Sequence, residues 1–187
     1  MRIVVVTSNK DKFDEIAKIL SEFKIDAEQA SLDINEEGST LDEIVVDKAK
    51  KAFDEIKQPL IVDDTGVYFN AYEDFPGAYP RRVFEKLGLA GLLKKLEGKD
   101  RGAFFRTILC YIDENGTKMF DGNLDGNISE KIYDPGRQAL PYDRIFIPYG
   151  HQEPMCSLNL DQITKISHRA QATRKFAAWF MKNKFKK

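Results

Sequence analysis

An apolar run that leads into two adjacent carboxylates constrains this chain more than any other feature of its sequence. Residues 60–62 read as a buried strand, and Asp63, Asp64, Thr65 and Gly66 follow directly. A carboxylate at the end of a core strand is costly unless a cation or a hydrogen-bond network stabilises it. Because successive strand residues point to opposite faces, at most one of the two carboxylates points into a given cleft. A simple turn at the end of a strand, held by an Asx hydrogen bond, explains such a pair equally well.

A second polar segment follows an apolar strand near the start of the chain. Residues 3–6 are apolar, and Thr7, Ser8 and Asn9 come directly after them. The helical spacing of apolar residues over 11–23 places this segment at a helix N-terminus, where unpaired backbone N–H groups and the helix dipole favour a phosphate. Two strands that carry phosphate-type and metal-type groups at their carboxyl ends indicate a nucleotide enzyme.

The order of the expected elements indicates an α/β protein. Strands are expected at residues 2–6, 25–30, 60–63, 67–70, 103–112, 117–121, 124–132 and 145–147, and helices at 11–23, 40–57, 81–87, 89–97 and from 167 onward. The second helix starts at a capping box of Thr40 and Glu43, and Asn115-Gly116 predicts a hairpin. Helices alternate with strands early and a hairpin follows late, so we expect a mixed sheet flanked by helices, and one domain over residues 1–187.

Composition argues against several classes of function. The net charge of the 187 residues is -1, so no global field favours nucleic acid or an anionic membrane as a partner. The longest apolar runs fall far short of the roughly 20 residues that span a bilayer, and residues 3–6 are too short a run for a signal peptide. Cys110 and Cys156 lack metal-ligand spacing, so we expect reduced core thiols in a cytoplasmic protein.

Seven motifs resemble, in their order along the chain, the inosine triphosphate pyrophosphatases. This family hydrolyses deaminated purine nucleoside triphosphates to the monophosphate and pyrophosphate. The matching segments are Thr7–Lys12 with Glu15, the Glu36 loop, Lys48, Val62–Gly66, Phe75–Tyr79, Tyr142–Asp143 and Ser167–Arg169. The resemblance covers residues 3 to about 180 and implies Mg²⁺ as cofactor, with Mn²⁺ as an open alternative. It also implies a homodimer, an elongated mixed sheet, and a cleft between two lobes.

The resemblance assigns roles in the reaction to several polar residues. Lys12 and Lys48 become candidate catalytic cations for the phosphates. Glu36 and Asp64 become the metal carboxylates, since Mg²⁺ is usually held by one or two carboxylates together with water and phosphate oxygens. Glu37 is the rival of Glu36, and Asp64 is metal ligand, general base or both. The remaining candidates for binding the triphosphate are Thr7, Ser8, Asn9 and Thr65.

A base pocket is expected around a second group of residues. Ser167, His168 and Arg169 at a helix start are candidate donors for the carbonyl oxygen of a 6-oxopurine, although a histidine in such a place is also explained as a capping or core residue. Fixed donors would leave adenine, which has an amine there, with unpaired groups. Tyr142 is a candidate for stacking on the base, and Asp143 for accepting a base N–H.

Three departures from the family pattern affect this pocket. Leu140 and Pro141 stand where the family has a stacking aromatic and a glycine, Arg144 replaces a proline, and Ile163 replaces a lysine. Loss of a base–aromatic stack weakens binding by roughly 1–3 kcal/mol. Two alternatives therefore stay open: the same reaction with a different base preference, for example a modified pyrimidine, or an inactive protein that binds nucleotides.

Overall fold

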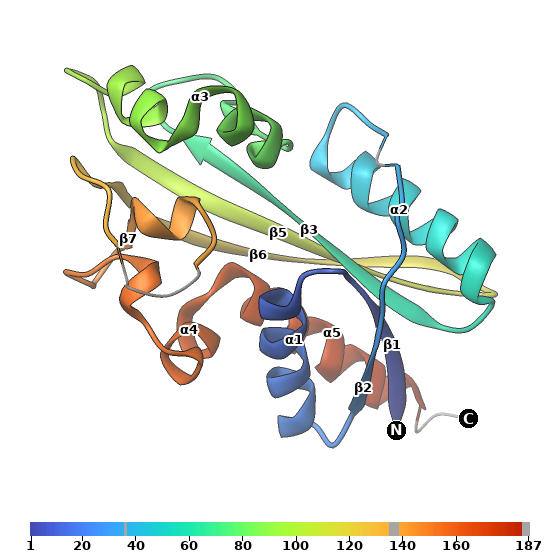
Figure 1. The fold of residues 1–187 in the computed structure, drawn as a ribbon. Helices are drawn as coiled ribbons and strands as arrows, with labels where there is room; N and C mark the ends of the chain where they lie inside the picture. The colour runs from blue at the N-terminus through green and yellow to red at the C-terminus, as the bar shows by residue number, and fades with distance from the viewer. Residues whose placement is uncertain (36, 135–138, 185–187) are drawn as a thin grey trace.

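The computed structural model describes residues 1–35, 37–134 and 139–184 (Figure 1). Within these ranges a seven-stranded sheet has the order β2-β1-β3-β5-β6-β7, with β4 also paired to β3. The strands are β1 (Arg2–Val6), β2 (Asp26–Ala30), β3 (Leu60–Phe69), β4 (Pro76–Gly77), β5 (Gly102–Asp113), β6 (Gly116–Ile128) and β7 (Phe146–Pro148). β1 runs parallel to β2 and β3, and the other pairings are antiparallel. The predicted mixed sheet is confirmed.

Five α-helices accompany the sheet in the described part of the chain. They are α1 (Lys10–Glu22), α2 (Leu41–Ile56), α3 (Pro80–Lys95), α4 (Leu160–Ile166) and α5 (His168–Lys184), with short 3₁₀ turns at Tyr142–Arg144 and Met155–Ser157. The predicted capping box of Thr40 and Glu43 starts α2, and Asn9 caps α1 by accepting from the Lys12 N–H. No helix among the described residues has the length and hydropathy that a bilayer-crossing segment requires.

Alternation along β3 and β5 places core side chains on both faces of the sheet. Ile61 and Leu109 join a cluster with α1 and α5 on one face, whereas Val62 and Ile108 join a cluster with α2 on the other. Figure 1 shows the same arrangement, with α2 and α5 on opposite sides of the long strands. A third cluster packs α3 against the far ends of β3 and β5. The division into two lobes stays a prediction.

Three boundaries differ from the sequence prediction. Residues 60–63 and 67–70 form one strand, β3, so the two aspartates lie inside a strand and not at its end. Residues 117–121 and 124–132 likewise form one strand, β6, which ends at Ile128. α3 joins the two helices predicted around Gly88, whose φ of 63° makes the kink that separates them and suits a residue without a Cβ. The short helix α4 was not predicted.

Candidate active site

A gap in the sheet beside β3 forms the centre of a large cleft. β1 pairs with β3 as far as Val62, and β4 takes over only at Val67. In the described part of the chain, residues 63–66 therefore have a strand neighbour only on the β5 side. The cleft of about 1460 Å³ opens at this gap and is lined by Asp64 and Thr65, among others. The floor of the site is thus the middle of a central strand.

Asp63 and Asp64 occupy different environments, as the alternation along a strand requires. Asp63 is 2% exposed and accepts from the guanidinium of Arg169 at 2.9 Å. Burial alone would raise the pKa of Asp63, but Lys12, Arg169 and Lys48 together hold it well below its usual range. Asp64 is only half-buried and lines the cleft. Asp63 therefore belongs to the structural network, and Asp64 faces the ligand space.

Arg169 connects three elements through one buried guanidinium. Its Nη1 donates to Glu15 of α1 at 2.7 Å, its Nε to Asp63 of β3, and its Nη2 to Thr65 at 3.2 Å. Glu15 also accepts from the hydroxyl of Ser167. Burial lowers the pKa of Arg169, but the two carboxylates outweigh it and raise that pKa. The guanidinium is permanently charged, and its contacts fix α5 against α1 and β3.

The two candidate lysines approach Asp63 and Asp64 from different helices. The Nζ of Lys12, on α1, lies 3.3 Å from Oδ2 of Asp63 and 4.0 Å from Oδ1 of Asp64. The Nζ of Lys48, on α2, donates to the carbonyl oxygen of Asp63 at 3.4 Å. Both line the cleft. Two cations beside Asp64 supply charge that a polyphosphate needs.

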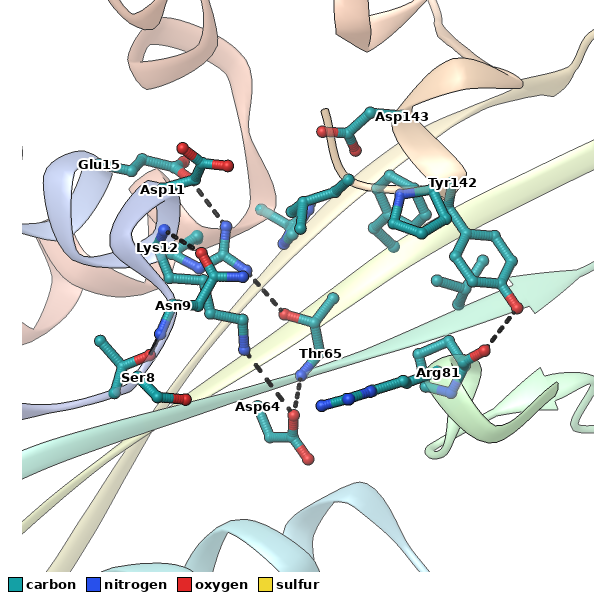
Figure 2. Close-up of a pocket in the computed structure, with 18 of the residues that line it drawn as sticks. Ser8, Asn9, Asp11, Lys12, Glu15, Asp64, Thr65, Arg81, Tyr142 and Asp143 are labelled. Atoms are coloured by element: carbon teal, nitrogen blue, oxygen red, sulfur yellow. Dashed lines mark hydrogen bonds and ion pairs between the residues drawn. The ribbon is translucent and has the colours of Figure 1, made fainter. Parts of the chain in front are cut away.

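The segment before α1 forms one wall of the cleft. Thr7, Ser8 and Asn9 all line it, and Figure 2 shows Ser8, Asn9 and Lys12 beside Asp64. The Asn9 N–H donates to the Thr7 hydroxyl at 3.2 Å, and Asn9 Oδ1 accepts from the Lys12 N–H at 3.1 Å. The amide of Asn9 and the remaining N–H groups of the first turn point the positive end of α1 toward this wall.

The predicted base-reading residues are brought to the same cleft. Ser167, His168 and Arg169 begin α5 and line it. All three are buried, so they act through few exposed atoms. Burial, with Arg169 next to it, lowers the pKa of His168 well below its usual range. The imidazole is therefore neutral near pH 7.

The opposite wall comes from α3 and the Tyr142–Arg144 turn. Tyr142 and Asp143 line the cleft, as do Leu140, Pro141 and Ile163. The Tyr142 hydroxyl donates to the carbonyl oxygen of Pro80 at 2.8 Å, which ties the turn to the start of α3. In Figure 2, Tyr142 and Arg81 lie across the cleft from Lys12.

The predicted metal carboxylates cannot both be placed. Glu36 lies outside the described residues. Among the residues that are described, no cluster of three or more carboxylate, histidine or cysteine side chains could hold a metal ion. Mg²⁺ does not require one, because it retains waters and takes phosphate oxygens from its substrate. Asp64, half-buried on the cleft floor, fits such an ion as a single protein carboxylate.

Sequence reasoning missed two residues of the site. Thr107, on β5, is fully buried and bonds both Thr65 and His168. Nothing in the alternating pattern of that strand distinguishes it from a core position. Arg81 lines the cleft from the first turn of α3 with an 89% exposed side chain, and its Nε donates to Glu85 at 2.9 Å.

Comparison with known proteins is consistent with this geometry. The family model described as Ham1 family matches residues 3–179. A dITP/XTP pyrophosphatase of Saccharolobus solfataricus is 39% identical over 179 residues, which are 95% of this chain and 92% of that protein. The dITP/XTP pyrophosphatase of Methanopyrus kandleri is 35% identical over 98% of both chains. The solved structure of a HAM1 protein from Coxiella burnetii superposes with a TM-score of 0.83 at 25% identity, covering 97% of this chain and 99% of that one.

Proposed function

The chain belongs to the Ham1 family, and we propose that it hydrolyses deaminated purine nucleoside triphosphates such as dITP and XTP to the monophosphate and pyrophosphate. One observation carries the proposal. Lys12, Lys48 and the N-terminus of α1 converge on Asp64 at the gap in the sheet. Cations, helix N–H groups and a carboxylate in one cleft are what hydrolysis of a phosphoanhydride requires.

The residues of the gap hold the triphosphate in place. Lys12 and Lys48 neutralise its oxygens from two sides, while the N–H groups before and in the first turn of α1 donate to it. Hydrolysis at the α-phosphorus breaks the α–β anhydride bond, and the leaving pyrophosphate keeps these cations as partners. Asp64 is placed on the cleft floor to orient or deprotonate the attacking water.

We propose that Asp64 holds Mg²⁺, together with Glu36. When bound, the ion supplies neutralisation of phosphate charge and lowers the pKa of a water molecule. Whether Mn²⁺ replaces it is tested by the same assay with the other metal.

A product assay tests the proposed reaction. The protein is incubated with Mg²⁺ and ITP, dITP, XTP, GTP, ATP, UTP or dTTP, and monophosphate, diphosphate and pyrophosphate are separated by chromatography. We expect ITP, dITP and XTP to give monophosphate and pyrophosphate in equal amounts. Release of diphosphate and inorganic phosphate, or no turnover of any nucleotide, would refute the proposal.

The variant Asp64→Asn tests the assigned residue. It keeps the shape of the side chain but removes its charge, so we expect at least about a hundredfold loss of kcat, within the range that general acid–base catalysis contributes. Asp54→Asn is the matched control, because Asp54 lies exposed on α2 and pairs only with Lys57 among the described residues. Near-normal turnover of folded Asp64→Asn would remove Asp64 from the mechanism.

A different base preference is the second candidate. Leu140, Pro141 and Ile163 do line the cleft, so the departures from the family pattern lie where a base would bind. The nucleotide panel decides this: a dominant pyrimidine in the assay would favour the alternative.

We also propose one domain over residues 1–187, a homodimer, and a cytoplasmic location. The family match over residues 3–179 supports the single domain. The free, buried Cys110 and Cys156 support a reducing compartment. Light scattering after size exclusion would test the dimer, which a monomer mass would contradict.

A further inference from the structure

A chain of hydrogen bonds leads from Arg169 to the ring of His168. Arg169 Nη2 lies 3.2 Å from Thr65 Oγ1, which lies 2.6 Å from Thr107 Oγ1. Thr107 Oγ1 lies in turn 2.5 Å from Nδ1 of His168. Thr107 is fully buried and does not line the cleft, so it touches the ligand space only through its two neighbours.

The charged end of this chain sets its direction. A guanidinium only donates hydrogen bonds, so Thr65 accepts from Arg169. The hydroxyl of Thr65 then donates to Thr107, and the hydroxyl of Thr107 donates to Nδ1 of His168. The reverse order would make Thr65 accept twice and leave its own proton without an acceptor among the described residues. Nδ1 is therefore the acceptor nitrogen, and the proton of the neutral ring is on Nε2.

The second ring nitrogen is open to the cleft. Nε2 of His168 has no hydrogen-bond partner among the residues that the structure describes, yet it is not one of the buried polar atoms left unpaired there. The residue itself lines the cleft. An unpaired nitrogen that is not enclosed by protein must reach the ligand space, where it presents an N–H.

We propose that Thr107 is a positioning residue that fixes His168 in the Nε2–H tautomer, so that the cleft presents a donor to the base and selects a carbonyl over an amine. The inference rests on the proposed function, because it concerns how the same cleft distinguishes nucleotides. A 6-oxopurine offers an acceptor to Nε2–H, whereas adenine offers a donor and leaves both groups unpaired. With the opposite tautomer the preference would be reversed.

Nitrogen NMR of the free protein tests the tautomer directly. The chain contains two histidines, His151 and His168, so protein labelled with ¹⁵N-histidine gives two rings, and a His151→Gln variant identifies which is which. We expect an unprotonated Nδ1 and a protonated Nε2 in His168 near pH 7. A protonated Nδ1 in the wild-type protein would overturn the proposal. No nucleotide is present, so the result is independent of whether the protein hydrolyses any.

Substitutions at Thr107 test the link to specificity. Thr107→Val keeps the shape but removes the hydroxyl, and we expect mixed tautomers and about a tenfold fall in the ratio of kcat/KM for ITP over ATP. Thr107→Ser keeps the hydroxyl and should retain both the tautomer and the ratio. An unchanged tautomer and ratio in folded Thr107→Val would overturn the proposal. Where Thr107→Val does not fold, loss of the tautomer or the ratio in Thr107→Ser would overturn it instead. If no nucleotide is turned over while the tautomer is as expected, it is the proposed function that fails.

Discussion

Replacing Arg169 by methionine should destabilise the protein severely, although the side chain has nearly the same length. The guanidinium is 5% exposed, and its two carboxylate partners, Glu15 and Asp63, are 6% and 1% exposed. The variant leaves both carboxylates buried, each with one remaining partner: Asp63 keeps Lys12, and Glu15 keeps the Ser167 hydroxyl. Breaking a buried ion pair by removing one partner costs about 3–5 kcal/mol, so we expect a loss of about 4 kcal/mol.

Urea denaturation followed by circular dichroism measures this loss. With a slope of about 2 kcal/mol per molar urea, typical of small proteins, the midpoint should fall by about 2 M at pH 7. Arg2→Met is the control, because Arg2 and Glu28 pair on the surface with 67% and 47% exposed side chains, and such pairs contribute about 0–1 kcal/mol. A loss below about 1 kcal/mol for Arg169→Met would refute the reasoning.

The pH dependence of the same difference provides a second check. Because the pKa of Asp63 is lowered in the folded state, its ion pairs contribute fully above the ordinary carboxyl pKa near 4. The contribution disappears as the pH falls through the lower folded-state value, where the native carboxylate takes up its proton. The difference in stability between wild type and Arg169→Met should therefore be constant near neutrality and shrink in acid.

Three further outcomes follow from the structure. Because burial lowers the pKa of His168 in the folded state, the free energy of unfolding should fall below about pH 6.5, where the unfolded chain binds a proton, with His168 contributing about 1.4 kcal/mol per pH unit; this slope should vanish in urea titrations of His168→Gln and persist in a variant of the exposed His151. Gly122→Ala should lower stability by about 1–3 kcal/mol in the same assay, since its Cβ would lie 2.0 Å from the carbonyl oxygen of His168, and unchanged stability would mean that α5 moves freely. Lys48→Met should lower kcat/KM for ITP about 10- to 100-fold through loss of a charged hydrogen bond, whereas the exposed Lys50→Met on the same helix should not.

Local signals predicted most of the elements because the chain states them locally. Thr40 and Glu43 mark the start of α2, and Asn115-Gly116 leads into β6, with Asp113 and Gly116 paired across the turn. The start of α4 was also readable, since Asn159 and Gln162 form a capping box, but the seven-residue helix has little periodicity of its own.

Tertiary contacts decided the strand boundaries that the sequence did not predict. The polar residues 63–65 and Gly66 read as a break, yet β3 continues through them because Arg169 and Lys12 pair with Asp63 and Thr107 pairs with Thr65. Gly122 also read as a break in β6, although it is the place where α5 approaches the strand. Neither partner is near in sequence.

The candidate site was predictable as a set of residue types but not as a network. The order of motifs placed Lys12, Lys48, Asp64 and the start of α5 in one cleft, and the structure brings them together. The contact between Arg169 and Glu15 spans 154 positions, so only the fold shows that the arginine is held by carboxylates. The role of Asp63 as a structural residue agrees with its burial.

The gap beside β3 also bears on how the protein avoids aggregation. A strand edge without a neighbour is a template on which another chain can add a strand. Here the open edge spans only residues 63–66, and β1 and β4 close it at both ends. Two charged side chains, Asp63 and Asp64, stand on that short stretch. The opening thus admits a small, charged ligand to the backbone of a central strand while it excludes an extended peptide, so the protein exposes a sheet edge at its centre without exposing a nucleus for amyloid-like pairing.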